Sequence, residues 1–255
     1  MNSPRNNSLE PVKLPGWRWQ PFFDFIIQSV SNLSLSNIII PKDFLQKEKL
    51  CNLNKKNISA KTVTWAGENT QLKKIRAACV EVNEVASVLN FVINPRHNIE
   101  MPFFGADFVS LPSGHLLALD FQPILKDDVS HMEVILDKLL PIHKYWQSFL
   151  PSGGNIPKEA QEFFSPAFLW SRLPLGEEGE KLINEVLFPA FRDYLSLYLN
   201  LLQDKKFVSG ERSMELLAGQ KRYLRYRTKK DPARNMLSRF YGSQWTESYI
   251  NEILF

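Results

Sequence analysis

Residues 101–123 read MPFFGADFVSLPSGHLLALDFQP, two apolar runs joined by the turn Leu111–Gly114. A Pro-Ser-Gly turn between two such runs predicts a β-hairpin. Each predicted strand carries one acid inside its apolar run, Asp107 in the first and Asp120 in the second. Burying a carboxylate is costly unless it is paired or protonated. The two acids are therefore either satisfied by structural partners or kept for chemistry, and the hairpin alone leaves both interpretations open.

The chain on either side of the hairpin separates into helical and strand-like segments. Apolar residues at helical spacing predict a helix over residues 21–35. Strand-like runs precede the hairpin at Thr62–Trp65, Lys74–Val82 and Ser87–Asn94. Helical stripes follow it over residues 129–140, 178–204 and 211–228; Pro141 should kink the first, and Pro189 interrupts the second. We expect one domain over residues 1–255, with helices packed on an antiparallel sheet and a flexible polar lead-in at residues 1–15.

The composition is typical of a soluble protein in a reducing compartment. Of the 255 residues, 44% are hydrophobic and 12% aromatic, enough for a sizeable core. No run approaches the roughly 18–20 apolar residues of a membrane span, and the N-terminus lacks the apolar segment of a secretory signal. Cys51 and Cys79 are too few and too isolated for a disulfide scaffold. We expect a cytoplasmic protein, or one of the plastid stroma if it is nuclear- or plastid-encoded.

No cofactor signature is found in the sequence. The four histidines (97, 115, 131 and 143) have no metal-ligand spacing. There is no Gly-rich phosphate loop, no GxGxxG, and no flavin, nicotinamide or iron–sulfur pattern. We expect no metal and no bound cofactor, so an oxidoreductase of this sequence must receive its electrons from outside.

Basic residues concentrate between residues 221 and 234, although the net charge is only +4. Seven of these positions are basic against a single acid, Asp231, and Tyr223 and Tyr226 lie among them. A solvated helix face explains the pattern. So does a nucleic-acid surface, an acidic protein partner or an anionic ligand. Charge alone does not distinguish between these interpretations.

Three further residues have both a structural and a functional interpretation. Asp231 followed by Pro232 is an ordinary helix start, and capping alone would explain it. Arg227, four residues earlier, can contact Asp231 or a ligand carboxylate, or lie free on the surface. Arg172, at the end of an apolar run, can likewise simply reach solvent.

Three ordered blocks carry a wider resemblance: residues 101–123, FFSPAFLWSRLPLGEEGE, and the tail RYRTKKDPARNML…FYGSQW…YINEILF. Together they resemble the ferredoxin-dependent bilin reductases from about residue 60 to Phe255, and most closely the branch that forms phycoerythrobilin. The resemblance implies a three-layer α/β/α sandwich, a mainly antiparallel sheet with helices on both faces. It also implies two-electron reduction of the A-ring diene of 15,16-dihydrobiliverdin to phycoerythrobilin. Reduced ferredoxin would supply single electrons, the bilin would pass through radicals, and the protein would supply protons.

The same resemblance assigns residues. Asp107 and Asp231 are the implied proton donors. Asn90 occupies the position of a histidine in the phycocyanobilin-forming branch, and Ala77–Cys79 lacks the glutamate of that branch, so this chemistry is not expected here. The implied bilin-binding residues are Asn90, Phe104, Ser171, Arg172 and Arg227, with Phe103 and Phe108 as further parts of an aromatic pocket around Asp107. The implied ferredoxin-docking residues are Lys221, Arg222, Lys229 and Lys230.

Three alternatives stay open at this stage. A sibling enzyme would reduce biliverdin to 15,16-dihydrobiliverdin, or perform both steps. A nucleic-acid-binding module would use the basic helix, with binding that weakens steeply with salt. A bilin carrier would bind pigment without reducing it. As a reductase, the protein is expected to be monomeric, to bind no nucleic acid or membrane, and to take its substrate from a preceding bilin reductase.

Overall fold

The computed structural model describes residues 8–53, 56–125, 128 and 130–255, and within them one eight-stranded sheet runs in the order β1-β3-β4-β5-β6-β7-β8. The long strand β3 pairs with both β1 and β2 along one edge, and every pairing between neighbouring strands is antiparallel. The strands are β1 Ser36–Asn37, β2 Gln46–Leu53, β3 Lys56–Glu68, β4 Leu72–Val82, β5 Ala86–Pro95, β6 Phe103–Leu111, β7 Gly114–Gln122 and β8 Leu169–Leu173.

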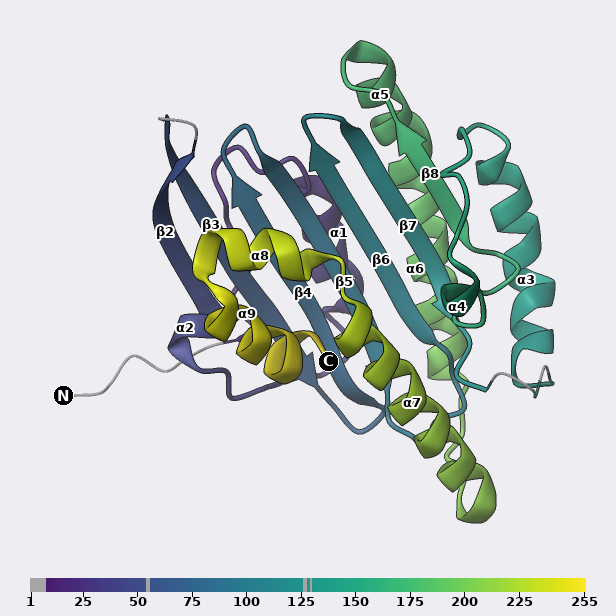
Figure 1. Cartoon of the computed structure of the whole chain (residues 1–255). Coiled ribbons are helices and arrows are strands. Elements are labelled where there is room, and N and C mark those ends of the chain that lie inside the picture. The colour runs from purple at the N-terminus through teal and green to yellow at the C-terminus, as the bar shows by residue number, and fades with distance from the viewer. Residues whose placement is uncertain (1–7, 54–55, 126–127, 129) are drawn as a thin grey trace.

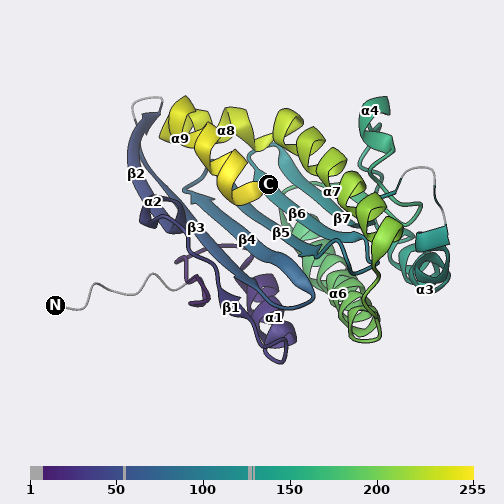
Figure 2. The ribbon, with the colours of Figure 1, turned by 90° about the horizontal axis from the view of Figure 1, so that it is seen from below.

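Helices cover both faces of this sheet (Figures 1 and 2), which confirms the expected α/β/α sandwich. Helices α1 and α6 lie on one face, and α7, α8 and α9 lie on the other. The helices are α1 Gln20–Val30, α2 Lys42–Leu45, α3 Ser130–Gln147, α4 Lys158–Gln161, α5 Glu177–Leu182, α6 Phe188–Gln203, α7 Gly210–Lys230, α8 Ala233–Tyr241 and α9 Ser243–Tyr249, with π-helical turns at Ile183–Leu187 and Ile250–Leu254.

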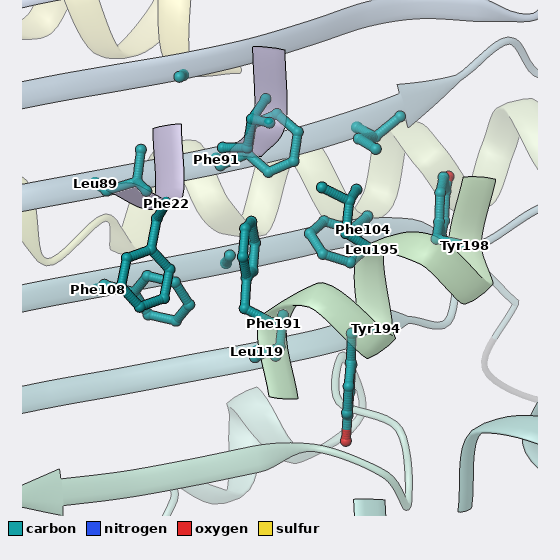
Figure 3. Packing of buried hydrophobic residues seen from close by; sticks show 14 of the residues in the cluster. Phe22, Leu89, Phe91, Phe104, Phe108, Leu119, Phe191, Tyr194, Leu195 and Tyr198 are labelled. Atoms are coloured by element: carbon teal, nitrogen blue, oxygen red, sulfur yellow. The ribbon is translucent and has the colours of Figure 1, made fainter. Parts of the chain in front are cut away.

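The face under α1 and α6 holds the larger hydrophobic core. Strand alternation turns Phe104 and Phe108 of β6 toward it, where they meet Phe22 of α1 and Phe191 of α6 (Figure 3). The Phe22 and Phe108 ring centroids lie 5.2 Å apart, and Phe108 and Phe191 5.6 Å. Burying each such side chain stabilises the fold by about 1.5–3 kcal/mol. This aromatic layer fixes the position of β6. It therefore also fixes the direction of the side chains on the other face of the strand, among them Asp107.

The face under α7–α9 is covered unevenly. Helices α8 and α9 pack over β3 and β4 through buried residues such as Phe240, Tyr241 and Tyr249. By contrast, the hairpin strands β6 and β7 are visible for most of their length in Figure 1. Part of this side is only half-buried, and we call it the open face: Gly105, Asp107, Val109, Leu116 and Ala118.

Several elements depart from expectation. The polar strand β2 and the short strand β8 were not predicted; β2, QKEKLCNL, is an edge strand, where charged side chains are tolerated because they face solvent. The helix expected over 178–204 is divided by the π turn Ile183–Leu187, just before Pro189, which has no N–H to donate to the preceding turn. Pro141 lies inside α3, which continues to Gln147.

The expected flexible lead-in over residues 1–15 is wrong for its described part; residues 1–7 lie outside the described chain. Val12 and Leu14 are 2% and 6% exposed in the large core. The backbone N–H of Ala66 donates to the Ser8 carbonyl oxygen at 2.8 Å, which attaches this segment to β3. Two apolar residues among polar ones are enough to anchor it.

Among the described residues, no helix combines the length and apolar character needed to cross a membrane.

Candidate active site

The strand register places four predicted or neighbouring residues in one row across the sheet. Asn90 of β5 pairs with Asp107 of β6, Asp107 with Ala118 of β7, and Ala118 with Trp170 of β8. Paired residues point to the same face, so all four belong to the side that carries α7–α9. The neighbours of Asp107 on this face are small: Ala118 opposite it, and Gly105, over which the Gln122 side chain lies.

Asp107 sits at the centre of this row, and its pKa is raised above the ordinary aspartate value. Burial is the largest cause, because it disfavours the charged form. The positive charge of Arg227 and a hydrogen bond from the Asn90 side chain act in the opposite direction but do not cancel it. A fraction of Asp107 is therefore kept neutral at a pH where a free aspartate would be ionised.

Asp231 connects α7 to α8 and is 8% exposed. Its Oδ1 accepts a hydrogen bond from the backbone N–H of Ala233 at 2.7 Å, so the capping interaction anticipated for Asp-Pro is present. Its negative charge also acts on Arg76, Asp107 and Arg227. The structure therefore brings the second predicted acid into the electrostatic neighbourhood of the first, although they are 124 residues apart in sequence.

Two guanidinium groups accompany the two acids. Arg227 lies one helical turn before Asp231 on α7, half-buried, with its guanidinium 5.5 Å from the centre of the Phe255 ring. Arg76 of β4 is 1% exposed on the same face of the sheet, and Asp231 and Asp107 are among the charges acting on it. Sequence reasoning missed Arg76, since a strand arginine ordinarily reaches solvent. Two acids and two arginines thus share one partly enclosed site.

Strand β8 separates two residues that had been assigned together. Arg172 is exposed on the open side, pairs with Leu116 in register, and lies 5.8 Å from the Trp170 ring centre. Ser171 points to the other face, is 0% exposed, and donates a hydrogen bond to the Pro151 carbonyl oxygen at 2.7 Å. Consecutive strand residues face opposite ways, so the expectation that both residues hold one propionate is wrong.

The predicted aromatic pocket is divided in the same way. Phe104 and Phe108 lie in the core against α1 and α6 (Figure 3), so they cannot touch a ligand on the open face. Phe103 points to the α7 side, with its ring centroid 4.8 Å from that of Tyr223. The assignment of Phe104 to bilin binding is therefore corrected: alternation in β6 turns it away from Asp107.

The predicted docking residues all lie exposed on α7: Lys221, Arg222, Lys229 and Lys230. Arg222 also donates to the Ile124 carbonyl oxygen at 3.3 Å, and the Lys230 ammonium lies 3.6 Å from Glu159. The two tyrosines between these cations pack against other residues, so they are not placed to stack on the bases of a nucleic acid. Tyr223 is 3% exposed, and Tyr226 stacks on Phe163 at 4.4 Å.

Asp120, the second hairpin acid, has a structural explanation. Its two carboxylate oxygens accept hydrogen bonds from the Ser165 backbone N–H, at 2.8 Å, and from the Ser165 hydroxyl, at 2.5 Å. Burial still raises its pKa to about 7, against these hydrogen bonds. The carboxyl group holds the segment before β8 onto β7. Within the described residues, no cluster of three or more histidine, cysteine or acidic side chains is arranged to hold a metal ion.

Comparison with known proteins identifies relatives over nearly the whole chain. A family model described as ferredoxin-dependent bilin reductase matches residues 23–255. Two relatives are named phycoerythrobilin:ferredoxin oxidoreductase. The protein of Prochlorococcus marinus (strain MIT 9211) is 54% identical over 255 residues, covering 100% of this chain and 99% of the relative. That of Synechococcus sp. (strain RCC307) is 52% identical over 255 residues, covering 100% and 97%.

The fold also matches a solved structure, that of phytochromobilin synthase from tomato in complex with biliverdin. The TM-score is 0.80 at 23% sequence identity, over 92% of this chain and 82% of the tomato chain. At this identity the likeness concerns the fold.

Proposed function

The chain belongs to the ferredoxin-dependent bilin reductase family, and we propose that it reduces the A-ring diene of 15,16-dihydrobiliverdin to phycoerythrobilin. The names of the relatives support the product. The observation that carries the proposal is Asp107, which is half-buried at the centre of the open face and whose pKa is raised by burial. The absence of the histidine at Asn90 supports this branch over the phycocyanobilin-forming one.

The reaction adds two electrons and two protons to the bilin. Ferredoxin supplies the electrons one at a time, and Asp107 and Asp231 each supply a proton. Arg76 and Arg227 lie near both acids, so each carboxylate left by a proton transfer has a positive charge to stabilise it. The two guanidinium groups thus place two positive charges beside the acids. A pigment with added electrons therefore enters positively charged surroundings.

The open face suits a flat conjugated substrate. Val109, Leu116 and Ala118 are half-buried apolar residues on this face, and Trp170 and Arg172 lie beside them on β8. We assign Arg172 and Arg227 to the two propionate groups, because a planar guanidinium matches a carboxylate in two hydrogen bonds. Asn90, hydrogen-bonded to Asp107, holds the acid in place beside the substrate.

The proposal also assigns the partners. An acidic ferredoxin would dock on the exposed cations of α7, where complementary charge mainly raises the association rate. The substrate is already a partly reduced bilin, so a reductase acting on biliverdin must precede this enzyme. We further propose that residues 1–255 form one domain and act as a monomer in the cytoplasm.

The test is a comparison of two pigments. Purified protein is mixed without oxygen with biliverdin or with 15,16-dihydrobiliverdin, together with reduced ferredoxin, and absorbance is followed. We expect only 15,16-dihydrobiliverdin to be converted, and phycoerythrobilin to be the product. Consumption of biliverdin would assign the preceding step, or both steps, to this enzyme. Binding of pigment without any change on reduction would make it a carrier.

A further inference from the structure

Arg76 is the most deeply buried charged group of the site, and it is incompletely hydrogen-bonded. The residue is 1% exposed on β4. Its Nη1 donates to the Asn90 carbonyl oxygen at 3.2 Å, whereas its Nη2 is buried and has no hydrogen-bond partner in the part of the chain that the structure describes. A buried donor without an acceptor is unfavourable, and more so when the group is charged.

The neighbouring acids do not satisfy this donor. Asp231 and Asp107 are close enough for their charges to act on Arg76, yet neither forms an ion pair with it among the described residues. Burial lowers the pKa of Arg76, but an arginine guanidinium stays charged at neutral pH. Arg76 therefore presents a fixed positive donor beside the two proton-donating acids.

The chemistry of the missing acceptor follows from these neighbours. A third carboxyl group placed beside Asp107 and Asp231 would meet repulsion whenever either acid is ionised. A neutral carbonyl oxygen accepts the same hydrogen bond without that cost. The two terminal rings of an open-chain bilin are lactams, and each offers one carbonyl oxygen of this kind.

We propose that Arg76 Nη2 donates a hydrogen bond to a terminal-ring lactam carbonyl oxygen of the bound bilin; this rests on the proposed function. The propionates are then left to the arginines nearer the surface. The contact also bears on the reaction. When the pigment accepts an electron, no bond breaks, and part of the negative charge moves onto the conjugated carbonyl oxygen. A preorganised cation there stabilises the reduced pigment more than the oxidised one.

The experiment compares Arg76→Met with wild type and with Arg96→Met. Arg96 is a matched control, because it directly follows β5, is ion-paired with Glu68 and donates to the Asn69 carbonyl oxygen, and has no part in the site. Each protein is titrated with 15,16-dihydrobiliverdin by absorbance, and the lactam carbonyl stretch of bound pigment is measured by infrared difference spectroscopy. For Arg76→Met we expect affinity to fall about tenfold or more and one carbonyl band to move to higher frequency. Arg96→Met should match wild type in both.

A merely structural role for Arg76 would change affinity or stability without moving the carbonyl band at saturating pigment. Unchanged affinity together with an unchanged band would overturn the proposal. If Arg76→Met does not fold, Arg76→Lys decides by the same two readouts, since it keeps the charge but lacks the guanidinium fork. The wild-type protein distinguishes the two proposals. If it neither binds nor reduces the pigment, the proposed function fails. If it does both, and the carbonyl band does not change in Arg76→Met, only this inference fails.

Discussion

The two acids of the β6–β7 hairpin lie on the same face of the sheet, and burial raises the pKa of both, yet their surroundings differ. Both carboxylate oxygens of Asp120 accept hydrogen bonds from Ser165, which lies in the segment before β8. Within the described residues, the groups that act on Asp107 are the Asn90 side chain and charges across the site, and Asp107 remains half-buried on the open face. A raised pKa alone therefore does not identify a catalytic acid. What distinguishes Asp107 is that its carboxyl group remains partly exposed on the open face.

The largest expected effect is on Asp107. Asp107→Asn keeps the size of the side chain but removes the transferable proton, so phycoerythrobilin formation should fall about 10²–10⁴-fold, the usual contribution of a general acid. Bilin affinity should stay within a few-fold of wild type. Because the neutral acid is the active form, wild-type turnover should fall as pH rises through the raised pKa. Turnover assays across pH check both points; a variant with wild-type rates would place the proton donor elsewhere.

Asp120 should affect stability and not turnover. Its folded-state pKa of about 7 lies above the unfolded value of 3.8, so protonation stabilises the fold. This contribution is complete below about pH 4 and is lost as pH rises through 7, with an upper limit of about 4 kcal/mol, some 3 units at about 1.36 kcal/mol each. Denaturant unfolding at several pH values should show this slope in wild type and its loss in Asp120→Asn. If Asp120→Asn stopped turnover without changing stability, the distinction between the two acids would not hold.

Asp231 tests whether a structural acid can also serve chemistry. Asn accepts the Ala233 N–H as well as Asp does, so Asp231→Asn should keep its melting temperature. Product formation should still fall, on the order of 10²-fold, because the second proton is missing. Parallel measurement of product and thermal unfolding separates the two roles. A fully active variant would leave Asp231 with only a structural role, as for Asp120.

The two surface-side arginines should change binding more than chemistry. Arg172→Ala and Arg227→Ala should each weaken bilin affinity about tenfold, the loss expected for a hydrogen bond between charged groups. Conversion of pigment already bound should slow less. Absorbance titration and single-turnover kinetics give the two numbers. Unchanged affinity in both variants would contradict the assignment of these two arginines to the propionate groups.

The smallest effect concerns the approach of ferredoxin. Neutralising Lys229 and Lys230 should slow turnover a few-fold at low ionic strength and little at high salt, where surface charges are already screened. Varying the salt concentration at limiting ferredoxin tests this. Equal slowing at every salt concentration would indicate a structural role, and Lys230, which lies 3.6 Å from Glu159, is the residue where that would arise.

The hairpin could be predicted from sequence because it follows from local alternation, whereas the three-layer sandwich was implied by the family resemblance. The same alternation, applied to β6 and β8, would have separated Phe104 from Asp107 and Ser171 from Arg172. Other features depend on distant chain. The hydrogen-bond partner of Asp120, Ser165, is 45 residues away, and no pattern in the hairpin predicts this contact. Arg76 is buried only because α8, α9 and the last turn cover β4, so its role could be found only in the folded chain.

The most direct test is electron paramagnetic resonance on Asp107→Asn and Asp120→Asn side by side, each loaded with 15,16-dihydrobiliverdin and frozen at intervals after reduced ferredoxin is added. Electron transfer requires nothing of either carboxyl group. The account predicts that a bilin radical builds up in Asp107→Asn with little phycoerythrobilin, while Asp120→Asn forms phycoerythrobilin as wild type does. Phycoerythrobilin formed at the wild-type rate by Asp107→Asn, or the same arrested radical in both variants, would contradict it.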